Sequence, residues 1–196
     1  MKFSYLLSGL ALLALGSGAA LAQAQAPAPA APPAPPEVKQ IGDWQVRCFP
    51  VQSPSPCDMF QQQGDERTKQ RILALSIAFD PFANAHLIQI VVPLGISVEP
   101  GVVIHSGSYT SKKMIYRRCD RAGCYVEAPL EASVIEGLSH AGDSAMVKIV
   151  ADDGKKYDLK VPLNGFTAAH DSMAEQAKQK AKPLPQAPAQ APAPAK

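Results

Sequence analysis

The chain has 196 residues, and its 19 basic and 17 acidic side chains leave a formal net charge of +2. This small excess comes from lysines near the two ends, namely Lys2, Lys178, Lys180, Lys182 and Lys196. The central part of the chain is therefore slightly acidic. It lacks the basic surface on which nucleic-acid binding depends, so composition argues against a nucleic-acid partner.

The first 22 residues are typical of a signal peptide. Lys2 precedes an apolar run at residues 3–15, and Ala20-Leu21-Ala22 offers the small residues that signal peptidase selects, with cleavage before Gln23. The alternative is a membrane anchor, but the run is too short to cross about 30 Å of hydrocarbon. We expect a mature protein in the periplasm, associated with the outer membrane or secreted, with no transmembrane segment.

Two low-complexity segments flank the central part. Residues 23–36 and 183–196 are Pro/Ala repeats, which lack large apolar side chains and many backbone donors. We expect both to be disordered and extended. They are spacers in one interpretation, and an envelope tether or a docking ligand in the other. The sequence predicts one folded domain at 37–173, followed at 174–196 by a helix end and a tail.

The four cysteines predict disulfides in an exported chain. Three pairings are possible, and we expect the two local ones, Cys48–Cys57 and Cys119–Cys124. Zinc is the alternative, but the cysteines lack Cys-x2-4-Cys spacing and supporting histidines. Each small loop closed by a disulfide contributes on the order of 2–3 kcal/mol of stability.

The domain is expected to be organised around a hairpin at residues 114–130. Two alternating segments flank Asp-Arg-Ala-Gly at 120–123, which predicts a four-residue loop. If Cys119 lies directly opposite Cys124 in the hairpin, their Cα atoms come within disulfide range. The resulting ladder places Arg118 opposite Tyr125, then Arg117 opposite Val126 and Tyr116 opposite Glu127.

Further strands and two helices are predicted along the chain. Alternating apolar residues predict strands at 42–48, 71–79, 86–96, 102–105, 145–151 and 156–163. Residues 59–68 are expected to form a hairpin connection or a short strand. An amphipathic pattern predicts a short helix at 130–138, and composition predicts another at 165–182. Many short strands with Gly/Pro/Asp turns favour an all-β, antiparallel sandwich with one internal and one C-terminal helix. An α+β roll is the second choice.

No catalytic or metal-binding motif is found. His86, His105, His140 and His170 lie at no metal spacing and in no nucleophile motif, so we expect each to be an ordinary satisfied or exposed side chain. Adjacent His105 and Ser106 would point to opposite sides of a strand. The acidic pairs at 65–66 and 152–153 fall in turns. We therefore predict a protein that is not an enzyme and holds no cofactor or metal.

One group of side chains is a candidate anionic-ligand patch. Basic residues crowd the hairpin and its approach, and tyrosines lie among them: Lys112, Lys113, Arg117, Arg118, Arg121, Tyr116 and Tyr125. Such a group can bind anionic glycans, lipid headgroups or an acidic protein. The alternative is an ordinary solvated edge, since Lys and Arg protect strand edges from aggregation.

Four motifs, taken together, resemble the invasion-associated locus B family. They are Asp43-Trp44-x-Val46-x-Cys48, Val92-Pro93-Leu94-Gly95, Cys119-x4-Cys124 with Gly123, and Leu163-Asn164-Gly165-Phe166. The resemblance covers residues 41–173. It implies an immunoglobulin-like β-sandwich, an exported protein of Gram-negative bacteria, and a part in host-cell invasion for pathogenic members. Candidate partners are then envelope components or host-cell surface molecules, and the alternative is a periplasmic accessory factor for envelope integrity or assembly. The resemblance supplies no catalytic residues.

Overall fold

The computed structural model describes residues 34–184 of the chain. The predicted signal peptide, the Pro/Ala segment up to residue 33 and the tail from residue 185 lie outside the described residues. Neither helix of the described part combines the length and the apolar character that a membrane span requires.

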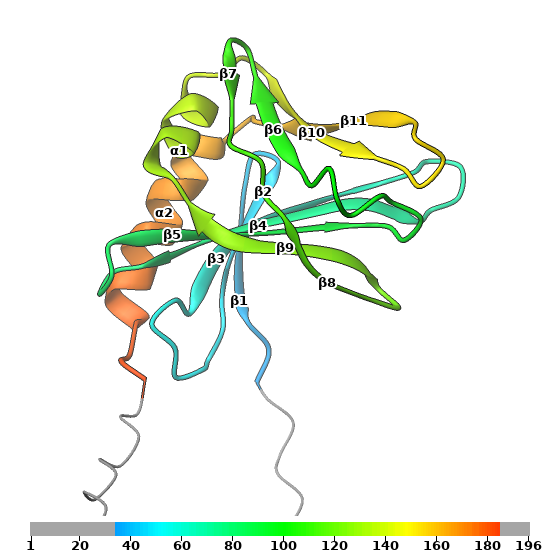
Figure 1. Cartoon of the computed structure of the whole chain (residues 1–196). Coiled ribbons are helices and arrows are strands. Elements are labelled where there is room, and N and C mark those ends of the chain that lie inside the picture. The colour runs from blue at the N-terminus through cyan, green and yellow to red at the C-terminus, as the bar shows by residue number, and fades with distance from the viewer. Residues whose placement is uncertain (1–33, 185–196) are drawn as a thin grey trace, which may run out of the picture. The chain divides into compact units, whose positions relative to one another are not determined.

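Two antiparallel sheets make up most of this part (Figure 1). The larger sheet has the strand order β1-β2-β3-β4-β5-β9-β8. Its strands are β1 (Glu37–Ile41), β2 (Trp44–Cys48), β3 (Cys57–Gly64), β4 (Arg71–Asp80), β5 (Ala85–Val92), β8 (Tyr116–Asp120) and β9 (Gly123–Leu130). The smaller sheet has the order β11-β10-β6-β7. Its strands are β6 (Val103–Ser106), β7 (Tyr109–Thr110), β10 (Ser144–Val150) and β11 (Lys156–Pro162).

One face of the larger sheet is covered by the remaining elements. Helix α2 (Phe166–Lys180) packs against β1 to β4 and also contacts α1 (Ala132–Ser139). Buried side chains of both helices and of the smaller sheet join those of the larger sheet in one hydrophobic cluster. We call this covered side the inner face and the opposite side the outer face. The all-β antiparallel sandwich with an internal and a C-terminal helix is confirmed.

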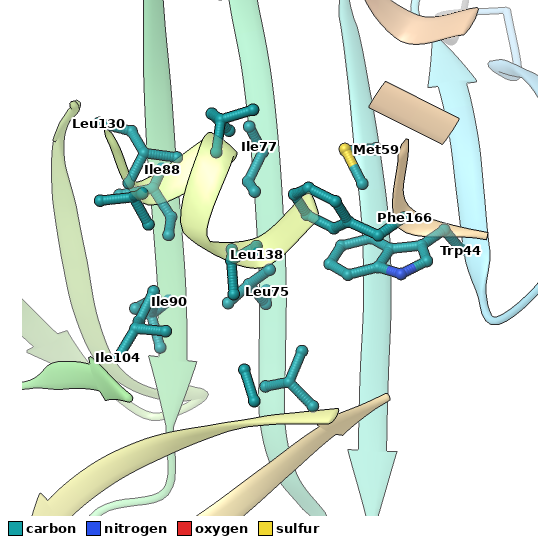
Figure 2. Close-up of a cluster of buried hydrophobic side chains, with 14 of the residues drawn as sticks. Trp44, Met59, Leu75, Ile77, Ile88, Ile90, Ile104, Leu130, Leu138 and Phe166 are labelled. Carbon is teal, nitrogen blue, oxygen red and sulfur yellow. The ribbon is translucent and has the colours of Figure 1, made fainter. Parts of the chain in front are cut away.

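The core forms on the inner face because the strands alternate in polarity. In β4, Leu73, Leu75 and Ile77 are at most 2% exposed, whereas the intervening Ser76 is half-buried on the outer face. Figure 2 shows Leu138 of α1 beside Leu75, and the Phe166 ring against Trp44. The Trp44 and Phe166 ring centroids are 5.3 Å apart in an edge-to-face arrangement. Such aromatic pairs contribute about 0.5–1.5 kcal/mol beyond the area they bury.

Several boundaries differ from the sequence expectation. The polar segment after Cys57 forms the eight-residue strand β3, because pairing with both β2 and β4 fixes its backbone. Strand β1 was not predicted, and its side chains are mostly exposed, so no apolar alternation marks it. Leu130 ends β9 rather than opening helix α1. Strand β5 ends at Val92, short of the predicted residue 96, because Pro93 has no N–H with which to continue the pairing.

Both expected disulfides are present. Cys48–Cys57 joins neighbouring strands β2 and β3 with the Cα atoms 4.1 Å apart, and Cys119–Cys124 joins β8 and β9 at 4.0 Å. In each case the two cysteines are directly opposed in the ladder. The disulfides therefore fix the register of two hairpins of the same sheet.

Candidate functional site

The outer face of the larger sheet is lined by rows of side chains that the strand register brings together. One row crosses β2, β3, β4, β5 and β9 as Gln45, Phe60, Ser76, Gln89 and Glu127. The next row is Arg47, Asp58, Ala78, Leu87 and Pro129. Small residues on β4 lie between larger neighbours, which leaves an open hollow of about 400 Å³. Its lining includes Ser76, Ala78, Leu87, Gln89, Arg117 and Glu127.

An ion pair on the neighbouring strands stiffens this face beside the hollow. Arg47 donates to both carboxylate oxygens of Asp58, at 2.9 Å from Nε and 2.5 Å from Nη2. The Ser76 hydroxyl donates to Asp58 Oδ2 at 2.7 Å. The Arg47 guanidinium also lies 3.7 Å from the centroid of the Phe60 ring. Because both ions are less than a quarter exposed, this bidentate pair holds a fixed geometry.

The hairpin that carries the predicted patch has a β-bulge that the sequence did not reveal. Cys119 faces Cys124 and Arg118 faces Tyr125, as expected, but Tyr116 then faces Val126. The register shift between Tyr116 and Arg118 inserts Arg117 as an extra residue. The predicted pairs of Arg117 with Val126 and of Tyr116 with Glu127 are therefore wrong. The expected four-residue loop is also wrong, because Asp120 pairs with Gly123 and leaves a two-residue turn.

The bulge changes which side chains share a face. Tyr116 packs against the core and is half-buried, and burial raises the pKa of its phenol to about 12. Arg117, which strict alternation would put beside Cys119, instead lies 3.7 Å from Glu127, a residue of the outer face. Arg118 Nη2 lies 3.4 Å from the other oxygen of the same carboxylate. Two neighbouring arginines thus converge on Glu127 at the edge of the hollow.

Arg118 is held by several partners at once. Its guanidinium lies 3.7 Å from the centroid of the Tyr125 ring, and its Nη1 donates to Asp120 at 2.5 Å. The backbone N–H of Ala122, together with Arg118 and the Tyr125 hydroxyl, lowers the pKa of Asp120. Asp120 therefore stays ionised and keeps Arg118 over the ring.

The remaining residues of the predicted patch lie elsewhere or are differently engaged. Lys112 donates to Glu131 at 2.6 Å, and this hydrogen bond raises the pKa of the lysine. Lys112 and Lys113 line a separate hollow of about 250 Å³ next to α1. Arg121 is exposed in the hairpin turn, and within residues 34–184 neither it nor Lys113 forms an ion pair. Of the seven residues, Arg117, Arg118 and Tyr125 are brought together on the outer face.

A second hollow, of about 410 Å³, contains two histidines that the sequence analysis treated separately. His86 at the start of β5 and His170 on α2 approach to 2.9 Å between their Nε2 atoms. Asp171 Oδ1 lies 3.1 Å from His170 Nδ1. Burial, and secondly the neighbouring imidazole, lowers the pKa of His86. The sequence analysis expected each histidine to be a satisfied or exposed side chain, and these two satisfy each other, a pairing that it did not predict.

The other two histidines remain apart from this pair. His105 interacts with Thr110 and His140 with the backbone oxygen of Glu136. His105 and Ser106 alternate in burial along β6, as predicted. The lining of the histidine hollow contains no Ser, Thr or Cys that could act as a nucleophile.

The motifs that suggested a family resemblance meet in pairs behind the outer face. Asp43 N–H donates to the Asn164 carbonyl at 3.0 Å, and Trp44 contacts Phe166. At Gly123, which has φ +141°, an added Cβ would lie 2.3 Å from the Val92 carbonyl oxygen. The motifs therefore lock the sheet to α2 and one hairpin to its neighbour, and their residue types are explained by packing.

A family model described as "Invasion associated locus B (IalB) protein" matches residues 44–174. The chain belongs to the invasion-associated locus B family. The IalB fold is also found in the crystal structure of invasion associated protein B from Bartonella henselae, with a TM-score of 0.64 and 20% sequence identity. That match covers 72% of this chain and 99% of the Bartonella chain. Among curated proteins, none matches the chain.

Sequence reasoning missed four residues of the two candidate sites of this IalB domain, namely Arg47, Asp58 and the histidine pair. A signal for the first two was available, because opposing Cys48 to Cys57 in an antiparallel ladder also opposes Arg47 to Asp58. No local signal joins His86 to His170. They are 84 residues apart and meet because α2 packs across the inner face.

Proposed function

We propose that this protein is an exported, non-enzymatic recognition protein of the bacterial envelope or cell surface that contributes to host-cell invasion or adhesion. Membership of the IalB family supports the invasion role. The two disulfides support a compartment outside the reducing cytosol. The sequence of residues 1–22 supports export.

The observation that carries the proposal is the pair of arginines beside the outer hollow. The Arg117 and Arg118 side chains are 72% and 46% exposed, and exposed ion pairs such as theirs with Glu127 contribute only about 0–1 kcal/mol. A carboxylate, sulfate or phosphate group of a ligand can therefore take the place of Glu127 at little cost. Tyr125 holds Arg118 in position, and the hollow accommodates the adjoining part of the ligand.

Loss of the basic side chains tests this ligand class. The double variant Arg117→Ser, Arg118→Ser is expected to lose salt-sensitive retention on a heparin-like matrix, because the two exposed cations beside the hollow are removed. The matched control is Lys148→Ser, Lys160→Ser, which removes the same charge from the smaller sheet. Equal retention of the two double variants would exclude the arginine site.

Location is tested separately by cell fractionation combined with protease treatment of intact cells. A surface role predicts that the protein is digested without lysis. A protein that is protected in intact cells and released with the periplasmic fraction would contradict a host-contacting role. That result would favour a periplasmic accessory factor for envelope integrity or assembly.

A further inference from the structure

The histidine hollow is not used by the arginine site, and its two imidazoles have a geometry suited to a metal ion. His86 Nε2 and His170 Nε2 face each other at 2.9 Å, with ring centroids 5.0 Å apart. Between two neutral imidazoles at this distance there is one hydrogen, which one Nε2 donates to the other in a hydrogen bond. We propose that His86 and His170 bind a divalent transition-metal ion, Cu²⁺ or Zn²⁺, in place of that hydrogen, which moves through solvent from Nε2 to Nδ1 of His86 so that both Nε2 lone pairs face the ion.

The distances support this exchange. Zinc–imidazole bonds are about 2.0–2.1 Å long, so two nitrogens of a tetrahedral site lie about 3.3 Å apart. The two nitrogens therefore need to separate by about 0.4 Å, and each ring must also turn so that its lone pair points at an ion lying off the line between them. Neutral imidazole suits copper, zinc and nickel, and copper forms the strongest complexes in this series.

The surroundings hold both rings in place before a metal binds. The His86 ring lies 4.9 Å from Phe79, and the His170 ring is stacked 6.5 Å from Phe166. Asp171 Oδ1 accepts a hydrogen bond from His170 Nδ1–H, which leaves Nε2 of that ring as the metal ligand. A carboxylate that accepts a hydrogen bond from the second ring nitrogen is one of the usual partners of a metal-binding imidazole.

The protein supplies two ligands, and water completes the coordination shell. Within residues 34–184, no three His, Cys, Asp or Glu side chains converge on one point. The hollow also contains Asp171 and Glu175, whose carboxylates favour a cation and offset the nearby ammonium group of Lys178. The ion would join β5 to α2, two elements that the chain itself connects only through a long intervening segment.

Metal titration of the purified chain, without an added affinity tag and after treatment with EDTA, tests the proposal. Calorimetry with CuCl₂ or ZnCl₂ should show one ion per chain, bound more tightly for copper, and saturation should raise Tm. His86→Gln and His170→Gln should each weaken binding at least about tenfold. Asp171→Asn should weaken it about tenfold with the stoichiometry unchanged, because this residue positions the ligand.

Two controls keep the outcome decisive. His105→Gln and His140→Gln remove histidines outside the hollow and should leave the affinity unchanged. In the unmodified chain, Cu²⁺ should broaden the NMR signals of His86 and His170 before those of the other histidines, a readout that needs no variant to fold. Equal affinities for the unmodified chain and His86→Gln, or no rise in Tm, would show that the pair is a hydrogen bond only.

Discussion

The two faces of the larger sheet are built from the same strands but are organised differently. The inner face is a continuous apolar cluster in which Trp44 and Met59 are fully buried. The outer face contains the Arg47–Asp58 pair and the arginines at Glu127, with a hollow between them. Successive side chains along a strand point to opposite faces of the sheet, so neighbouring residues lie in these two different environments.

The residues of the family motifs and the residues that can bind a ligand therefore lie in different parts of the sheet. The contacts of Trp44 with Phe166 and of Gly123 with Val92 are structural. They explain the residue types of the motifs by packing, and they assign the chain no chemistry. The exposed charges that can meet a partner lie on the opposite face, outside those contacts.

The largest expected effect is on the inner face. Replacing the buried Phe166 by Ala should lower the free energy of unfolding by about 3–5 kcal/mol, because a cavity forms against Trp44. The matched control on the outer face is Phe60→Ala, which loses contact area and the interaction with Arg47 and should cost roughly 1–2 kcal/mol. Denaturant unfolding measures both values. Equal losses would contradict the division between the two faces.

An intermediate effect is expected at the ion pair of the outer face. Asp58→Asn removes the charge and one acceptor from a carboxylate that takes hydrogen bonds from Arg47 and Ser76. The free energy of unfolding should fall by about 1.5–3 kcal/mol. Asp158→Asn, which weakens the more exposed pair with Lys148, should change it by less than about 0.5 kcal/mol. Unfolding in urea compares them, and similar losses would show that the Asp58 network is not a rigid support.

The smallest effect is expected at the bulge. The buried hydroxyl of Tyr116 has no hydrogen-bond partner among the described residues, so Tyr116→Phe should leave stability at pH 7 unchanged or raise it by up to about 1 kcal/mol.

The pH dependence of the Tyr116 variant sharpens this prediction. In the folded protein, burial raises the pKa of Tyr116 to about 12 from its ordinary value of 10.0. Between pH 10 and pH 12, unfolding therefore releases a proton from the Tyr116 phenol, so the free energy of unfolding falls as the pH rises through this range. Tyr116→Phe lacks this loss, so its advantage over the unmodified protein should grow between pH 9 and pH 11. A constant difference in urea midpoint would indicate that the phenol is solvated.

Much of the fold could be predicted from the sequence because its signals are local. Alternation placed Leu73, Leu75 and Ile77 on one face of β4, and the structure confirms their burial. The two local disulfides that were expected from the sequence are the two that the structure contains. The candidate site was predicted less well. Arg118 over Tyr125 followed from the ladder, but the position of Arg117 did not, because no local pattern marks the bulge.

The sequence by itself determined most of the strands, the local disulfides and the family, since each depends on residues that are near one another or on motifs in a fixed order. The tertiary structure alone decided that Arg117 joins Arg118 at Glu127 and that His86 meets His170. The first depends on one inserted residue, which turns Tyr116 to the inner face and Arg117 to the outer face while Arg118 stays opposite Tyr125. The second depends on where a helix packs, which is set by the shape of the whole core rather than by any segment.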